Sequence, residues 1–230
     1  MNFAESFRTA LSLILSLDRD VFSAVWTSVS VAAWATVFSA MFGIPLGMVI
    51  ELGQFPLKRS VITVLNTLMA VPTVVIGLVV YGFISRMGPF GHWGLLFTPS
   101  AIIIGETVLA VPIVANYTLG AVKAADYRVL PTALTLGATP FQSVVQLTRE
   151  VRFGVVAGVI AGFGRVISEV GVAMMLGGNI QWYTRTMTTA IALETSKGEF
   201  AFGLALGVIL IAVALVINLL LNFVQHRPAA

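Results

Sequence analysis

The sequence contains no cysteine and only two histidines, His92 and His226, which lie far apart in the chain. Disulfide bonds, thiolate metal sites and cysteine nucleophiles are therefore excluded, and a histidine metal centre is not expected. The chain also lacks the glycine-rich G-x-x-x-x-G-K-[ST] loop that holds nucleotide phosphates, and no Ser-His-Asp set or ligand cluster is visible. We expect no enzymatic activity and no cofactor, so any ATP hydrolysis belongs to another polypeptide.

Charged residues are scarce, at 10% of the 230 positions, whereas 58% are hydrophobic and the mean hydropathy is +0.97. A soluble domain of this length cannot bury so much apolar surface, so most of it must face lipid. The 13 Lys and Arg residues only slightly outnumber the 10 Asp and Glu, which does not indicate a nucleic-acid partner. We use the basic residues instead as markers of membrane topology.

Near the N-terminus, a short apolar run over residues 9–17 ends at Asp18-Arg19-Asp20 without a small-residue cleavage site. This is not the pattern of a cleaved signal peptide. Apolar residues between positions 3 and 17 recur at spacings of three and four, which favours a helix lying in the membrane interface. We expect such an interfacial helix within residues 1–20.

Five segments have the apolar length of about 20 residues that a membrane-crossing helix needs. They cover approximately residues 22–50, 61–85, 95–117, 153–176 and 200–224. Lipid-facing backbone must hydrogen-bond to itself, and the alternation of a barrel is absent, so each span is expected to be a helix. The predicted fold class is an all-α integral membrane protein, with one transmembrane domain over residues 1–230.

Special residues within these spans predict local features. A stripe of Gly154, Gly158 and Gly162 allows another helix to approach closely, either inside the chain or at a subunit interface. Three prolines within spans favour kinks because each frees a backbone carbonyl: Pro45, Pro72 and Pro112.

The distribution of basic residues predicts the orientation. With five crossings, one side of the membrane carries seven of them: Lys58, Arg59, Lys123, Arg128, Arg149, Arg152 and Arg227. The other side carries Arg8, Arg19, Arg86, Arg185 and Lys197, mostly scattered or beside acidic residues. We therefore expect the N-terminus outside and the C-terminus in the cytoplasm.

The stretch "PTALTLGATPFQSVVQLTREVRFG" (131–154) is the longest without a spanning pattern. It overlaps the segment 123–152, which this orientation makes cytoplasmic. Pro131 is suited to the first helical position (N1), and Thr132 to Leu136 are expected to be helical. Gly137 and Ala138 permit a close turn, and Thr139-Pro140 can cap and start a second helix. The segment suits either a surface that a partner grips or an ordinary amphipathic loop.

This segment resembles the coupling motif of type I ATP-binding cassette importer permeases, in which Glu-Ala-Ala, three residues, Gly, nine residues and Ile-x-Leu-Pro follow one another. Aligning the family glycine with Gly137 places Pro131, Thr132 and Ala133 at the Glu-Ala-Ala positions and Leu147 at the isoleucine. Arg149 and Glu150 replace the family's Leu-Pro, which is a departure from the motif. The resemblance implies that the ATPase-coupling residues are Pro131, Thr132, Ala133, Gly137, Ala138, Thr139 and Pro140.

A second stretch, "GRVISEVGVAMMLGGNIQWYTRTMTTAIALETSKGEFAFGLALG" (164–207), resembles oxyanion permeases. Its Glu-Val-Gly, Gly-Gly-Asn and Thr-Arg-Thr elements are most similar to the tungstate-uptake branch, as are residues 71–83 and 97–122. The resemblance covers nearly the whole chain. It implies the type I importer permease fold, import by alternating access through a homodimer, cytoplasmic ATP-binding cassette subunits and an extracytoplasmic oxyanion-binding protein. The expected location is the inner membrane of a bacterium or archaeon.

Two kinds of alternative remain. The cargo could be molybdate or sulfate, which related permeases carry, because the residues that discriminate the anions are expected in the binding protein. A secondary transporter or a channel acting without an ATPase is the alternative from another class, and it would leave the segment 123–152 unexplained.

Three ionisable residues lie at membrane depth, where charges are costly and usually face the bundle interior: Glu106, Arg165 and Glu169. The spacing of four places Arg165 and Glu169 on one helix face. The guanidinium of Arg165 either offers donors to the transported oxyanion or pairs internally with Glu169 or Glu106.

Residues 177–199 are expected to form the largest external loop. Its tight turn at Gly178-Asn179 could offer backbone amides to an anion, so we include both residues among the candidates for the pathway or gate. Trp182 and Tyr183 are typical of the aromatic belt at a membrane surface. The loop suits docking of a binding protein, simple anchoring in the membrane, or both.

Overall fold

The computed structural model describes residues 3–126 and 128–225, and these are helical with no strand among them. Eleven α-helices and one short 3₁₀ turn, η1, follow one another within this part of the chain. Their bounds are α1 Phe3–Leu15, α2 Arg19–Leu52, α3 Lys58–Ala70, α4 Thr73–Ile84, η1 Gly91–Trp93, α5 Pro99–Ala124, α6 Val129–Thr135, α7 Pro140–Glu150, α8 Arg152–Ile167, α9 Gly171–Gly177, α10 Met187–Lys197 and α11 Phe200–Gln225.

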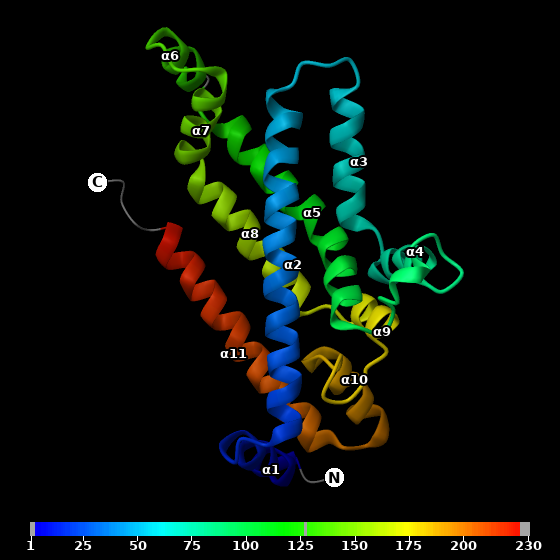
Figure 1. Cartoon of the computed structure of the whole chain (residues 1–230). Coiled ribbons are helices and arrows are strands. Elements are labelled where there is room, and N and C mark those ends of the chain that lie inside the picture. Colours follow the sequence, from blue (N-terminus) through cyan, green and yellow to red (C-terminus); the bar gives the residue numbers. More distant parts are fainter. Residues whose placement is uncertain (1–2, 127, 226–230) are drawn as a thin grey trace.

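Three helices, α2, α5 and α11, are long and apolar enough to cross a membrane without interruption. Figure 1 shows α2 along the centre of the bundle, with α5 crossing behind it and α11 to one side. Helices α2 and α5 continue through Pro45 and Pro112, so neither proline ends its helix. These helices correspond to the predicted spans 22–50, 95–117 and 200–224.

The other two predicted spans, 61–85 and 153–176, are not continuous helices. Helices α3 and α4 bend by 100° at their junction, and α8 and α9 bend by 61°, so the described residues form up to five spans only if each pair counts as one. At the first junction Pro72 has no N–H to donate and disfavours helical backbone at Val71. At the second, the Glu169 side chain takes the backbone N–H groups that would otherwise extend the helix.

The two ends of the bundle differ. Helices α6 and α7 lie at one end together with the turn between α2 and α3, and α1 and α10 lie at the other (Figure 1). We refer to these as the α6–α7 end and the α1–α10 end. Residues 1 and 2 of the predicted interfacial segment 1–20 lie outside the described residues, and the helix α1 ends at Leu15. The chain turns at Leu17, and the Asp18 carboxylate caps α2 by accepting the N–H groups of Asp20 and Val21. Helix α1 packs against α11.

Glycines set the separation between helices. A methyl group on Gly154 or Gly158 would lie 2.5 Å from the Cβ of Ala121 or Tyr117 in α5, so the glycine stripe of α8 faces another helix of the same chain. The contact between α2 and α5 is closer still, because a methyl on Gly47 would lie 2.4 Å from the carbonyl oxygen of Ala115. Close approach through small residues is the usual way that helices pack in lipid.

Gly47→Ala is therefore expected to destabilise the protein by about 1–3 kcal/mol, since the obstructing atom belongs to the backbone and cannot rotate away. Thermal unfolding in detergent measures the effect. The matched control is Gly207→Ala in α11, where a methyl group meets nothing within 4 Å. Equal melting temperatures for the two variants would contradict the close α2–α5 contact.

Candidate functional site

The turn between α6 and α7 forms a sharp corner. Gly137 has φ +88°, a left-handed backbone conformation that favours glycine. Thr139 caps α7: its hydroxyl accepts the N–H of Gln142, and the Gln142 side chain accepts the N–H of Thr139. The predicted helix, turn and cap are thus present. The helix α6 begins at Val129, however, so the prediction that Pro131 is its first residue is wrong.

The tip of this corner exposes two large apolar side chains, Leu136 at 83% and Phe141 at 77% of their surface. The opposite face of α7 is anchored, because Leu147 packs with Met48 of α2 and Val122 of α5. Sequence reasoning missed Leu136 and Phe141 as functional candidates. The available signal was a pair of bulky apolar residues on either side of the glycine turn. The corner is joined to the spanning helices and presents a small apolar surface.

The break between α8 and α9 is organised around Glu169, which is buried. Its Oε1 accepts the backbone N–H groups of Gly171 at 2.8 Å and Val172 at 3.2 Å, and its Oε2 accepts from Arg165 Nη1 at 2.7 Å. The Thr188 hydroxyl donates to the Glu169 carbonyl at 2.6 Å, which ties α10 to the same point. Both carboxylate oxygens are therefore occupied, and Glu169 fixes where α8 ends and α9 starts.

Arg165 is thus held in the internal ion pair that the sequence offered as one of two alternatives. Its side chain is 40% exposed, so only part of the guanidinium is taken up by Glu169. Glu106, by contrast, is 3% exposed and forms no ion pair with Arg165, and its Oε2 is buried without a hydrogen-bond partner. Of the three candidates at membrane depth, the structure pairs Arg165 with Glu169 and leaves Glu106 unpaired.

The other two candidates, Gly178 and Asn179, lie past the end of α9. The Gly178 N–H donates to the Met174 carbonyl at the end of α9. The prediction that this N–H is available to an anion is therefore wrong. The amide of Asn179 donates to the Thr189 carbonyl at 3.5 Å, while its oxygen is buried without a partner. These residues belong to the α1–α10 end and do not join Arg165 and Glu169.

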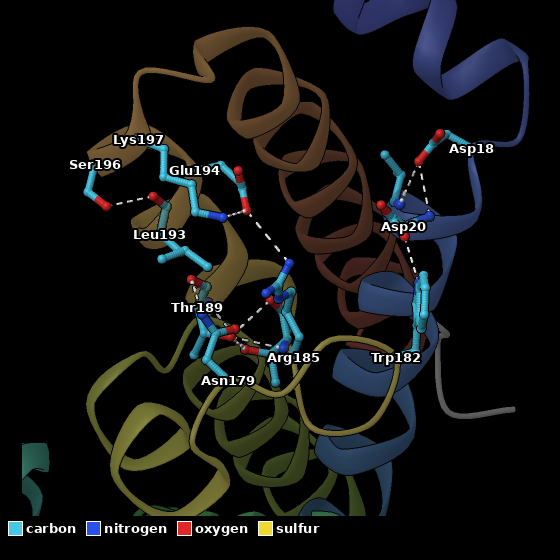
Figure 2. A network of polar contacts seen from close by, with 12 residues as sticks. Asp18, Asp20, Asn179, Trp182, Arg185, Thr189, Leu193, Glu194, Ser196 and Lys197 are labelled. Carbon is cyan, nitrogen blue, oxygen red and sulfur yellow. Dashed lines mark hydrogen bonds and ion pairs between the residues drawn. The ribbon is translucent and has the colours of Figure 1, made fainter.

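Residues 177–199 were predicted to be a loop, but they contain the helix α10. Figure 2 shows that polar contacts fasten this region to the start of α2: the indole N–H of Trp182 donates to Asp20 at 2.6 Å. The Arg19 guanidinium lies 5.0 Å from the centre of the Trp182 ring. In α10, Glu194 pairs with Arg185 at 3.6 Å and with Lys197 at 3.0 Å. Ion pairs between its own side chains therefore stabilise the segment 177–199.

The chain is similar over nearly its full length to known transport proteins. Residues 43–229 match the family described as binding-protein-dependent transport system inner membrane component. The chain is 38% identical to the tungstate uptake system permease protein TupB of Peptoclostridium acidaminophilum, over 97% of this chain and 98% of that one. It is 39% identical to TupB of Campylobacter jejuni, over 97% and 92%.

Solved structures support the fold. The inward-facing MetNI methionine ABC transporter gives a TM-score of 0.75 at 19% identity, covering 92% of this chain and 97% of that chain. A bacterial alginate ABC transporter in complex with an alginate-bound periplasmic protein gives 0.71 at 19% identity, covering 94% and 82%. The relatives are permeases, which makes the chain a transport subunit and not an enzyme. The chain belongs to the binding-protein-dependent transport system inner membrane component family, as a permease subunit of an ATP-binding cassette transporter.

Proposed function

We propose that this permease imports tungstate, driven by ATP hydrolysis on a separate subunit. The observation that carries the proposal is the similarity to two tungstate permeases along almost the whole of both chains. Molybdate is the second candidate cargo, because the molybdenum permease ModB of Mycobacterium tuberculosis is 29% identical over 86% of this chain.

The α6–α7 end faces the cytoplasm in this proposal, and the N-terminus lies outside with α1 in the outer interface. The support is the gathering of basic residues near this end, among them Lys58, Arg59, Lys123 and Arg149, since positive charge marks the cytoplasmic side. The C-terminus then lies in the cytoplasm. The α1–α10 end receives the extracytoplasmic binding protein.

Two copies of the chain form the pathway, and each contacts an ATPase subunit through its α6–α7 corner. The residues aligned with the coupling motif shape this corner, and Leu136 and Phe141 supply its apolar contact. Because α7 packs on the ends of α2 and α5, a displacement of the corner reaches the membrane helices directly. Alternating access follows if the ATPase pair binds one arrangement of the two permeases more tightly than the other.

Reconstitution tests the function. The permease is placed in liposomes with its cognate ATPase subunit and binding protein, and uptake of tungstate, molybdate and sulfate is measured with and without ATP. We expect ATP-dependent uptake in which tungstate outcompetes the other two anions. Preferential uptake of molybdate or sulfate would show that tungstate is not the main cargo. Uptake without ATP or the ATPase subunit would refute the proposal that the permease belongs to an ATP-driven importer.

A further inference from the structure

Helix α3 presents a polar face to its surroundings at membrane depth. Arg59, Thr63 and Asn66 follow one another at spacings of four and three, so they lie on one side of the helix, and all three are exposed. Asn66 lies eight residues past Lys58, which is about 12 Å along the axis of a helix. An amide at this depth has left the charged end of the helix and entered the apolar part of the membrane.

Helix α5 carries a matching row. Asn116, Gly120 and Lys123 share one face at the same two spacings, and Asn116 Nδ2 donates to Asn66 Oδ1 at 2.6 Å. The two rows run side by side toward the α6–α7 end, where Arg59 and Lys123 line one hollow. We call Arg59, Thr63 and Asn66 of α3 with Asn116, Gly120 and Lys123 of α5 the polar strip.

The polar strip does not suit lipid. The side-chain N–H groups of Asn66 have no partner within the described part of the chain, and an unpaired amide facing hydrocarbon is strongly disfavoured. The other side of the same helices is different: Phe42, Leu68 and Val108 line a hollow between α2, α3 and α5 that is almost wholly apolar. Its one hydroxyl, that of Thr107, donates to the Ile103 carbonyl of its own helix. The apolar side thus suits lipid, and the polar strip suits water.

A groove runs beside Asn116 between α5 and α8. Its volume is about 420 Å³, and Tyr117, Gly120, Gly154 and Ala157 contribute to its lining. At roughly 30 Å³ for each water-sized atom, a tetrahedral oxyanion takes on the order of 150 Å³, so the groove can hold one together with some water. Asn116 lines this groove beside small residues, and its side-chain nitrogen already donates to Asn66 Oδ1 at 2.6 Å and to Met69 Sδ at 3.0 Å.

The hollow at the α6–α7 end is positively charged. It measures about 570 Å³ and is lined by Lys58, Arg59, Lys123 and one carboxylate, Glu51. Glu51 pairs with Lys58, whereas Arg59 and Lys123 have no acidic partner among the described residues. This excess of cations raises the local concentration of an anion.

We propose that the polar strip lines the cytoplasmic half of the oxyanion pathway and that the Asn66 amide, held in place by Asn116, contacts the passing anion. This inference rests on the proposed import function. An amide donates hydrogen bonds to tetrahedral oxygens without the full charge that would retain a dianion, and passage requires contacts weak enough to release. Arg165 is less suited to the task because Glu169 already holds it. Arg59 and Lys123 then attract the anion electrostatically toward the hollow at the α6–α7 end.

Asn66→Asp tests the contact. The carboxylate keeps the acceptor for Asn116 Nδ2 and therefore the bond between α3 and α5, but it replaces the free N–H donors by a negative charge that repels the cargo. In liposomes with the ATPase subunit and binding protein, tungstate moved per ATP hydrolysed is expected to fall about tenfold or more. ATP hydrolysis stimulated by the loaded binding protein is expected to stay near that of the unmodified protein.

The matched control is Ser60→Asp, which adds the same charge to the first turn of α3 beside the strip and should leave the ratio unchanged. A purely structural amide pair would give the opposite pattern, with normal transport per ATP in Asn66→Asp and lower melting temperature and yield in Asn66→Leu. That result overturns the proposal. If the hollow instead holds an anionic lipid headgroup, Arg59→Gln with Lys123→Gln would release co-purified lipid without changing transport, which also overturns it. Failure of the unmodified protein to move any oxyanion refutes the proposed function itself.

Discussion

Glu169→Ala is expected to cost about 2–4 kcal/mol of stability, because an unsatisfied buried backbone N–H costs about 1–3 kcal/mol. The change leaves two backbone N–H groups at the start of α9 unpaired and releases Arg165 at membrane depth. The break between α8 and α9 then loses the side chain that defines it. Thermal unfolding in detergent, followed by the fraction of protein that stays monodisperse after heating, measures the loss.

Two further variants separate the roles of this carboxylate. Glu169→Gln keeps an oxygen for the N–H groups of Gly171 and Val172 and should cost less than alanine. Arg165→Met removes the half-exposed partner but keeps both backbone hydrogen bonds of Glu169, so it should also cost less than alanine. If Arg165→Met retains transport and normal protein level while stability falls, the arginine is a structural partner and not an anion contact. A Glu169→Ala protein as heat-resistant as the unmodified one would contradict the organising role of Glu169.

The double variant Leu136→Ala, Phe141→Ala is expected to lose most of its affinity for the ATPase subunit. Apolar side chains at the centre of an interface each contribute about 2 kcal/mol when they are hot spots, so the loss of both should weaken affinity by a factor of about 1,000 if the two effects add. ATP-driven uptake should fall with it, while the permease itself remains folded because both side chains point away from the bundle. Binding of the purified ATPase subunit to permease in nanodiscs measures the change.

The control for this double variant is Met87→Ala, which trims a side chain that is 99% exposed near η1, far from the corner in sequence. It should bind the ATPase subunit normally. Unchanged binding by the double variant would mean that Leu136 and Phe141 are not the contact, and the docking surface would have to be sought elsewhere on the α6–α7 end.

The features that could be predicted from the sequence were those encoded by neighbouring residues. The capping of α7 by Thr139, the turn at Gly137 and the ion pair over one helical turn from Arg165 to Glu169 all depend on short spacings. The break at Glu169 was missed because the apolar run continues across it, and only the carboxylate's hydrogen bonds reveal it. At the other break, Pro72 was visible but indicated a kink and not a 100° turn.

The Asn66–Asn116 contact could not be predicted from the sequence for a different reason. The two residues are 50 positions apart and lie on different helices, so no local pattern joins them. Likewise, the occupation of the Gly178 N–H by the Met174 carbonyl depends on how α9 ends, which composition does not reveal. Local chemistry was predictable, whereas the meeting of distant helices required the fold.

The seam between α2 and α5 has a mechanical consequence. At Gly43 and Gly47 the backbones approach until no side chain fits between them, so sliding or prying these helices apart would break many contacts at once. Helix α3, in contrast, has Leu65 as its one buried residue and ends at a proline joint. In the proposed transport cycle we therefore expect α2 and α5 to move together as one rigid unit, and the bending to be confined to α3 and its junction with α4.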